Sequence, residues 1–479
     1  MLIEKYELNG FMATEEQASI VNRAKTGESF KVMSLAGTGK TTTAELIAAY
    51  HKVPTTYICF SKIIADKAKN RMPGVDARTI NSIAYRKVLD YKKDSGRVVP
   101  NLYVTDVASS LEISKGRAVI VRTALINFCI SSDREILGHH LKDLKNPEQS
   151  YSPDMEQEII FLAKKYWDLA WRKDSKVLIS HDFYVKKFHI DNLKINTQLI
   201  IIDESQDLNP VNDGIIKNQK DAQVVWIGDE NQQIFKWRGA VNQMSLLDLP
   251  EERLTASFRF GPELAKVANI ALNALDSKYL LEGEGGNTQV IIDQTPKNLT
   301  GKTFLGRTNI YLVIEALGAA KKNKKIFLPS YKDAKAAIWS GYFLKQGMPE
   351  KVYYAPFKGI RSWEELYEKS DDEPEIAQIV KFIENFDYKI KKTLDLIENM
   401  NCELPDEADV RFYTIHKSKG EEFKEVVLSP EFSEVEYVSE LGHKNKDELN
   451  LVYVAITRAK EKLFIESALI DNLKSVAKK

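Results

Sequence analysis

The sequence is poor in cysteine and lacks long apolar runs. Its three cysteines, Cys59, Cys129 and Cys402, lie far apart and form no CxxC pair. This spacing argues against a zinc site or a disulfide framework and is typical of a reducing compartment. No apolar run approaches the roughly 18–20 residues of a membrane span, and the opening MLIEKYELNGFMATEEQ has no apolar signal-peptide core. We therefore expect a protein of the cytoplasm or nucleoid in a prokaryote or virus, and of the nucleus in a eukaryote.

An excess of charge of either sign is also missing. Lys+Arg and Asp+Glu both number 68, so the net charge is zero. A neutral chain can still bind nucleic acid, because a single groove can be locally basic. The 479 residues, with 43% apolar and 28% charged side chains, are ordinary for a globular protein and long enough for several domains.

What the sequence does contain is a series of short apolar runs, each of the kind that forms a buried parallel strand. They lie at 30–35, 55–60, 197–203 and 222–229 in the first half, and at 288–293, 302–307, 411–416, 425–430 and 461–467 in the second. Helical patterns separate many of these runs. The pattern predicts an α/β protein with two parallel-sheet cores.

Two mainly helical stretches, 105–180 and 330–400, interrupt this alternation and are interpreted as insertions. The expected organisation is a first core from 1–104 plus 181–250 and a second core from 251–329 plus 401–479.

The stretch SLAGTGKTTT, residues 34–43, has the form of a phosphate-binding loop in which Ser34 replaces the usual first glycine. Gly37 and Gly39 permit the backbone bends that a phosphate nest requires. Lys40 would reach the β- and γ-phosphates, and the Thr41 hydroxyl would bind magnesium. The loop predicts a site for ATP and Mg²⁺, although by itself it could be an ordinary glycine-rich turn.

Carboxylates follow a later apolar run in IIIDESQD, residues 200–207. Asp203 would hold magnesium, and Glu204 would orient and deprotonate the attacking water. An acidic loop after a strand is common, but together with SLAGTGKTTT it indicates a hydrolytic nucleotide site. Gln232 is a candidate sensor of the γ-phosphate, and Arg259 and Arg458 are candidate cations for it, although either arginine taken alone is more often structural.

The stretch IGDENQQIFKWRGA contains Phe235 and Trp237 beside Lys236 and Arg238. Aromatic side chains with adjacent cations suit single-stranded nucleic acid. A core role for the two aromatic residues is equally consistent with the pattern.

The ordered set SLAGTGKTTT, LIIIDESQD, IGDENQQIFKWRGA, SFRFG, GRTN, TIHKSKGEEF and NLVYVAITRAK resembles the UvrD/Rep-type DNA helicases of superfamily one. The sequence is most similar to the helicase core of the F-box DNA helicases, without an F-box, so that a bare motor is expected. The motifs span residues 17 to 460. The resemblance implies two RecA-like cores of the P-loop NTPase type, each with a helical insertion.

This resemblance implies an ATP-dependent helicase or translocase that moves 3′ to 5′ on single-stranded or tailed duplex DNA and is able to act as a monomer. The second insertion is shorter than in the large bacterial helicases, which favours translocation over strong unwinding. An alternative is an ATP-driven remodeller that strips proteins from DNA in recombination control or defence. A nucleotide-gated binding protein without motor activity is a third reading, which the complete set of hydrolytic residues argues against.

The resemblance also assigns roles to residues. Gln17 would read the adenine edge, Phe258 would stack on the adenine, and Glu422 would contact the sugar. The phosphates would be held by the turn that contains Ala36, Gly37, Thr38, Gly39, Lys40, Thr41 and Thr42, since the family lacks the first glycine. The expected DNA contacts are Lys62, Thr79, Asn81, Ser82, Phe235, Trp237, Arg307, Asn309 and His416. Asn81 stands where relatives usually have histidine.

Overall fold

A computed structural model describes residues 5–142, 151–236, 239, 241–370, 373–439 and 441–478. The chain forms two compact units, the first from Met1–Ser34 with Gly39–Leu254, and the second from Leu35–Thr38 with Thr255–Lys479. Each unit contains a six-stranded sheet in which every neighbouring pair of strands is parallel. The prediction of two parallel α/β cores is therefore confirmed.

The first sheet has the strand order β10-β3-β9-β8-β4-β5. Its strands are β3 (Phe30–Ser34), β4 (Thr55–Ile58), β5 (Asp76–Arg78), β8 (Leu199–Ile202), β9 (Gln223–Gly228) and β10 (Glu251–Leu254). β10 consists of residues 251–254, which were assigned to the second core because the boundary was placed at 250. It pairs instead with β3, so the first sheet continues to Leu254.

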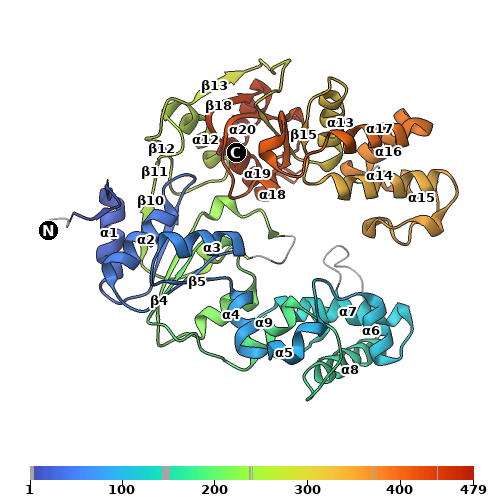
Figure 1. Cartoon of the computed structure of the whole chain (residues 1–479), viewed down its shortest axis with the longest axis horizontal. Helices are drawn as coiled ribbons and strands as arrows, with labels where there is room; N and C mark the ends of the chain where they lie inside the picture. Colours follow the sequence, from blue (N-terminus) through green and yellow to red (C-terminus); the bar gives the residue numbers. More distant parts are fainter. Residues whose placement is uncertain are drawn as a thin grey trace. The chain divides into compact units, whose positions relative to one another are not determined.

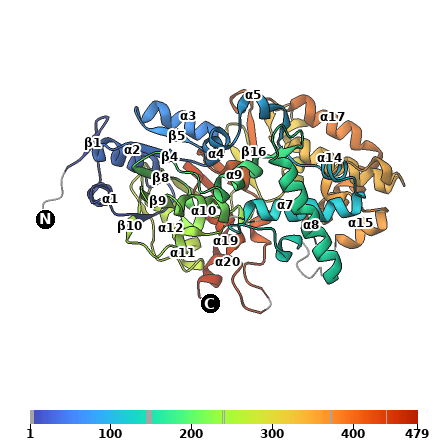
Figure 2. The ribbon, with the colours of Figure 1, turned by 90° about the horizontal axis from the view of Figure 1, so that it is seen from below.

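Helices cover both faces of the first sheet. One face packs on α1 (Glu15–Ala24), α2 (Lys40–His51) and α3 (Lys62–Arg71), through residues such as Ile20, Ile47 and Ile201. In Figure 2 the strands lie between α2 and α3 on one side and α10 (Pro210–Lys217) on the other. The interior strands β8 and β9 are buried along their whole length, which explains why LIII and VVWIG are continuous apolar runs.

The helical insertion of the first unit contains α6 (Val104–Leu111), α7 (Lys115–Ile130) and α8 (Pro153–Ala170). Around it lie α4 (Ile80–Val88), α5 (Tyr91–Asp94), α9 (His181–Ile190) and the short strand pair β6 (Val98–Val99) and β7 (Ile179–Ser180). Trp167 joins α8 to its neighbours, since its ring lies 5.3 Å from both Phe128 and Phe183. Helices α4 and α9 pack side by side (Figure 1).

The second sheet has the order β13-β18-β17-β14-β16-β15. Its strands are β13 (Gln289–Ile292), β14 (Thr303–Gly306), β15 (Ile326–Phe327), β16 (Val410–Thr414), β17 (Phe423–Leu428) and β18 (Ala459–Ile465). The accompanying helices are α12 (Pro262–Ala274), α13 (Asn309–Ala320), α18 (Ile415–Ser418), α19 (Lys446–Ile456) and α20 (Ser467–Ala477). Short elements elsewhere are β1 (Glu7–Leu8), β2 (Phe11–Met12), α11 (Gln243–Leu246), β11 (Ala256–Ser257) and β12 (Glu282–Gly283).

The second helical stretch forms α14 (Tyr331–Lys345), α15 (Trp363–Lys369), α16 (Pro374–Phe386) and α17 (Ile390–Met400). One continuous apolar cluster joins it to the sheet, from Phe304 on β14 through Val313 on α13 to Ile338, Ile383 and Leu394. These helices therefore extend the second core without forming a core of their own. Within the described parts of the chain, no helix combines the length and apolar character that crossing a membrane requires.

Candidate functional site

Three predicted site segments follow three neighbouring strands of the first sheet. The loop to Lys40 follows β3, the segment from Asp229 to Gln232 follows β9, and Asp203 and Glu204 follow β8. These strands are adjacent in the order β3-β9-β8 and parallel. Because the carboxyl ends of parallel strands share one edge of a sheet, the fold gathers these side chains where ligands of α/β proteins bind.

The loop between β3 and α2 has the conformation of an anion site. Gly37 and Gly39 adopt left-handed φ values of 76° and 81°, which glycine reaches without steric cost. Gly39 caps α2, whose first turn contains no acidic residue, so the amide groups and the helix N-terminus favour a phosphate. The Lys40 Nζ donates to the carbonyl oxygen of Ser34 at 2.9 Å. Ser34 is the last residue of β3, and it holds the lysine through its backbone carbonyl oxygen. A serine can make this bond as well as a glycine can.

Gln17 lies beside this loop. It closes a capping box with Thr14 at the start of α1, and its Nε2 donates to the Thr43 hydroxyl on α2 at 3.2 Å. Only 5% of Gln17 is exposed. Thr41 and Thr42 lie in the first turn of α2 and are half-buried, whereas Ala36 and Thr38 are buried.

Asp203 is buried and its neighbour Glu204 is half-buried, and the two carboxylates have distinct surroundings. The Tyr57 hydroxyl donates to Asp203 Oδ2, and the Glu204 amide donates to Asp203 Oδ1 at 3.0 Å. Burial, and then the neighbouring Glu204 carboxylate, raise the pKa of Asp203 to about 6. Glu204 has a left-handed φ of 54°, and its Oε2 accepts a hydrogen bond from Gln206 Nε2 at 2.5 Å. Its backbone and its carboxylate are therefore both fixed.

Gln206 connects the acidic pair to the β9 loop, a role that sequence reasoning missed. Its amide oxygen accepts from the Asp229 backbone N–H at 3.1 Å, and Asp229 Oδ2 accepts from Gln232 Nε2 at 2.6 Å. A hydrogen-bonded chain thus runs from Glu204 to Gln232. Gln206 is completely buried. Its position within DESQD was the signal for this role in the sequence, because a buried amide next to the acidic pair must satisfy both its donor and its acceptor.

The second unit brings its own predicted residues together. Arg259 donates to the Thr457 carbonyl oxygen at 2.8 Å and pairs with Glu422 at 3.3 Å. Lys460 pairs with the same carboxylate at 3.3 Å. Burial opposes the charge of Glu422, but Arg259 and Lys460 hold its pKa below the usual range.

Arg458 follows Thr457 directly, so the two predicted arginines approach the same backbone segment. It is 2% exposed and donates to the carbonyl oxygens of Val454 at 3.0 Å and Glu421 at 3.2 Å. Phe258, beside Arg259, exposes 49% of its surface, as a residue available for stacking does.

A groove of about 760 Å³ lies within the first unit. Its lining contains Asp203 and Glu204, and also the predicted residues Lys62, Thr79, Asn81 and Phe235. Phe60 lines it too, half exposed and stacked on the buried Phe235 with ring centroids 5.4 Å apart and planes 7° apart. Ser82 is joined to Thr79 by the N-cap bond of α4. Trp237 lies outside the described residues.

In the second unit, the predicted residues follow β14 and β16, which are adjacent and parallel. The Arg307 guanidinium forms a bidentate pair with Glu448, at 2.9 and 2.6 Å, and Glu448 raises the pKa of Arg307. Asn309 is half-buried at the start of α13, and His416 is half-buried on α18. Arg307 is therefore already engaged within the protein.

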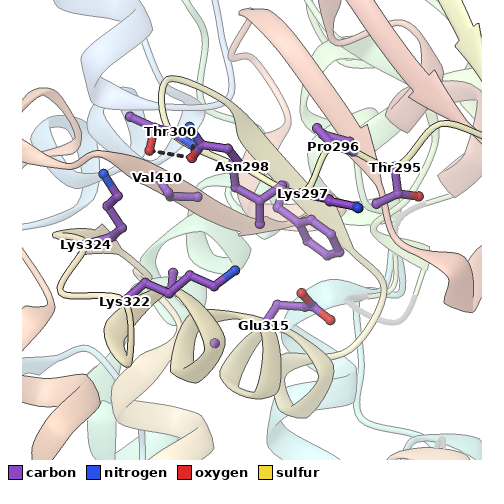
Figure 3. Close-up of a pocket in the computed structure, with 13 residues that line it drawn as sticks. Thr295, Pro296, Lys297, Asn298, Thr300, Glu315, Lys322, Lys324 and Val410 are labelled. Carbon is purple, nitrogen blue, oxygen red and sulfur yellow. Dashed lines mark hydrogen bonds between the residues drawn. The ribbon is translucent and has the colours of Figure 1, made fainter.

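A smaller pocket of about 160 Å³ lies at the opposite edge of this sheet (Figure 3). It is lined by Phe304 and Val410 near the starts of β14 and β16, and by Lys297, Glu315 and Lys322. Its lining contains none of the residues predicted to bind nucleotide or DNA.

Comparison with known proteins gives three findings. A family model described as the UvrD-like helicase C-terminal domain matches residues 65–469. The chain is 28% identical to "F-box DNA helicase 1" of Gallus gallus and 26% identical to "F-box DNA helicase protein 1" of Schizosaccharomyces pombe, over 95% of its length in both cases. It covers 49% and 57% of these relatives, so it spans about half of their length.

Among solved structures, the chain is similar to the arterivirus nonstructural protein 10 helicase in complex with DNA, at 13% identity and a TM-score of 0.35 over 96% of this chain and 65% of that one. It is similar to the PRRSV helicase at 11% identity and a TM-score of 0.35, over 94% of this chain and 54% of that one.

Proposed function

Because this chain belongs to the UvrD-like helicase family, we propose that it is an ATP-driven motor that moves 3′ to 5′ along single-stranded DNA. The observation that carries this proposal is the hydrogen-bonded chain from Glu204 through Gln206 and Asp229 to Gln232, beside Lys40 at one edge of the first sheet. This arrangement combines a phosphate-binding loop, a candidate general base and a polar group able to respond to the phosphate.

The donor set fits ATP with Mg²⁺. Lys40 and the amide groups at the start of α2 suit the phosphates, and an Asp203 carboxylate oxygen with the Thr41 hydroxyl offers the hard oxygen ligands that Mg²⁺ prefers. When bound, Mg²⁺ would neutralise the charge that develops on the β- and γ-phosphate oxygens. Gln17 and Phe258 would contact the adenine, and Glu422 the sugar.

In the proposed reaction, Glu204 holds the attacking water and accepts its proton. The Gln206 bond at 2.5 Å fixes the carboxylate that does so. Arg259 and Arg458 would stabilise the negative charge of the transferred phosphoryl group. Gln232 is bonded to Asp229 and would respond to the loss of the γ-phosphate.

The strand would occupy the groove of the first unit. Phe60 and Phe235 provide an aromatic pair against which a base can stack, a contact worth roughly 1–3 kcal/mol per base. Lys62, Thr79 and Asn81 supply polar contacts in the same groove. Glu204 lines this groove as well. The proposed base and the residues proposed to bind the strand therefore lie in one groove, which would couple hydrolysis to strand binding.

The test is the ATPase rate with single-stranded DNA, duplex DNA and RNA, followed by translocation assays of both polarities. Stimulation by single-stranded DNA and movement from 3′ to 5′ are expected. A rate that no nucleic acid changes would refute the motor.

The alternative use of the same motor is to displace proteins from DNA. Comparing the unwinding of a forked duplex with the removal of a bound recombinase filament separates the two uses. Faster filament removal with little unwinding would favour the remodeller.

A further inference from the structure

Tyr57 on β4 was not among the predicted site residues, although the first sheet places it beside Asp203. In the parallel pair of β4 and β8, Tyr57 is aligned with Ile201, and both belong to one buried apolar cluster. Asp203 follows the end of β8, and its backbone N–H still donates to the Ile58 carbonyl oxygen of β4 at 2.9 Å. Because the side chains of a strand alternate between the two faces of its sheet, Ile201 and Asp203 lie on the face that Tyr57 shares.

The Tyr57 hydroxyl is a hydrogen-bond donor with a fixed position. The residue is completely buried, in the apolar cluster that also contains Ile47 and Leu199. A hydroxyl in such surroundings cannot bond to bulk water and takes a partner within the protein. This partner is Asp203 Oδ2, to which the hydroxyl donates. Since packing holds the tyrosine ring, the hydroxyl determines where the carboxylate oxygen lies.

The Asp203 carboxylate, the proposed ligand of Mg²⁺, is held through both of its oxygens. An ionised carboxylate has about four acceptor positions. Tyr57 occupies one position on Oδ2, and the Glu204 amide, at 3.0 Å, occupies one on Oδ1. Each oxygen therefore keeps an acceptor position for an ion, while the donors on opposite oxygens prevent the carboxylate from rotating. Hydrogen bonds of this kind orient the carboxylate ligands of metal ions in proteins generally.

We propose that Tyr57 is a positioning residue for Mg²⁺, which holds the Asp203 carboxylate in the orientation that binds the ion. This inference rests on the proposed function, because it requires that ATP with Mg²⁺ occupies the site beside Lys40. Tyr57 is completely buried, so it acts through Asp203 and contacts neither the ion nor the nucleotide. Loss of its hydroxyl therefore weakens the part of nucleotide binding that depends on Mg²⁺, and it leaves unchanged the part that the phosphate-binding loop supplies.

The first experiment measures the binding of a fluorescent, non-hydrolysable ATP analogue to the full-length wild type and to Tyr57→Phe. Each protein is titrated once with Mg²⁺ and once with EDTA, and the ratio of the dissociation constant in EDTA to that in Mg²⁺ isolates the contribution of the ion. In Tyr57→Phe this ratio should fall about tenfold, while the dissociation constant in EDTA stays within about twofold of the wild-type value. A purely structural defect would weaken binding in both solutions.

Tyr166→Phe is the matched control. Tyr166 on α8 is completely buried, and its hydroxyl donates to the Leu178 carbonyl oxygen at 2.7 Å. The substitution therefore removes a comparable hydrogen bond from a buried tyrosine of the same unit, within the helical insertion. Both dissociation constants should equal those of the wild type.

A double-mutant cycle tests whether Tyr57 acts through Asp203. If it does, Tyr57→Phe has no further effect on the ratio in the Asp203→Ala background. Additive effects of the two substitutions, or a wild-type ratio in Tyr57→Phe, would overturn the proposal. If the wild type does not bind the analogue, or binds it equally well in Mg²⁺ and in EDTA, the proposed nucleotide site has failed together with the role of Tyr57, and this outcome is distinct from the other two.

Discussion

The charged groups among the predicted site residues have different surroundings in the two units. In the first unit, Asp203 and Asp229 are buried, and burial raises the pKa of each. Lys40 is the cation whose charge opposes both shifts. In the second unit, Arg259 and Lys460 lower the pKa of Glu422. The first site is thus short of positive charge and suited to accept a cation, whereas the second holds its cations in place by pairing them.

The residues expected to contact DNA differ between the units in a related way. In the first unit, Lys62 and Asn81 are exposed and line an open groove. In the second, Arg307 is bound by both oxygens of Glu448. A strand can contact the first set directly but must compete with a carboxylate for Arg307. If the proposed function is correct, the two units would therefore bind the strand with unequal strength.

The largest expected effect concerns the acidic pair of the first unit. Glu204→Gln removes the proposed base but keeps an amide that can still bond to Gln206, so the ATPase rate should fall about 10²- to 10⁴-fold with strand binding retained. The rate with saturating single strands measures this. Glu252→Gln is the control, because Glu252 pairs with Arg23 in the same unit, away from the site. A wild-type rate in Glu204→Gln would exclude Glu204 as the base.

A second substitution probes the cations of the other unit. Arg259→Lys keeps the charge but loses the fork that reaches Thr457 and Glu422 together, and lysine does not reproduce bidentate geometry. We expect the turnover rate to fall about 10- to 100-fold, the cost of one charged hydrogen bond. Turnover equal to that of the wild type would show that charge alone suffices at this position.

The third prediction tests whether the pairing of Arg307 with Glu448 limits the contact of Arg307 with the strand. Glu448→Gln should release Arg307 and tighten single-strand binding about three- to tenfold, with a steeper dependence on salt because one more phosphate is neutralised. Titrations by fluorescence anisotropy at several salt concentrations measure both quantities. Glu398→Gln, which breaks an exposed pair with Lys335 elsewhere in the second unit, is the control. Unchanged affinity in Glu448→Gln would mean that Arg307 does not contact the strand.

The smallest expected effect is on stability. Because the pKa of Asp203 in the folded protein is raised to about 6, its ionised form opposes folding at neutral pH, and the penalty is relieved as the pH falls through 6. Asp203→Asn should therefore raise the melting temperature of the metal-free protein at pH 7 by about 2–4 °C. The gain should shrink as the pH falls below 6, because folded Asp203 then binds the proton and no charge is buried.

Differential scanning calorimetry at pH 7 and pH 4 tests this sign. Asp221→Asn, at a carboxylate whose side chain is 89% exposed in the same unit, should change nothing. A variant less stable than the wild type at pH 7 would show that the hydrogen bond from Tyr57 outweighs the cost of burying the charge.

Whether the sequence pattern predicted a strand depended on the position of that strand in its sheet. The interior strands β3, β9, β8 and β4 were all anticipated as apolar runs. The two edge strands of the first sheet, β5 and β10, and one edge strand of the second, β15, were not. β5 and β10 are only partly buried, and β15 has two residues, so none of them shows the continuous apolar pattern of a strand covered on both faces. The boundary between the two cores was placed at 250 for the same reason, because β10 shows no continuous apolar pattern.

The site residues divide in a similar way. The apolar runs before Lys40, Asp203 and Glu204 predicted that these residues follow strands, and the structure places them after β3 and β8. The contacts of Gln206 could not be predicted, because its partner Asp229 lies 23 residues away along the chain. The pairing of Arg307 with Glu448 joins residues 141 positions apart and likewise left no local signal.

The sequence by itself determined the fold class, the family and the identities of the chemical groups, because buried strands need apolar runs and a phosphate loop needs glycine, lysine and threonine at fixed spacing. The tertiary structure alone decided the strand order, which places β3, β9 and β8 side by side, and therefore which loops meet. It also decided which charges are paired and which face a groove. These properties depend on contacts between residues distant in the chain, whose distances and burial set each hydrogen bond and each pKa.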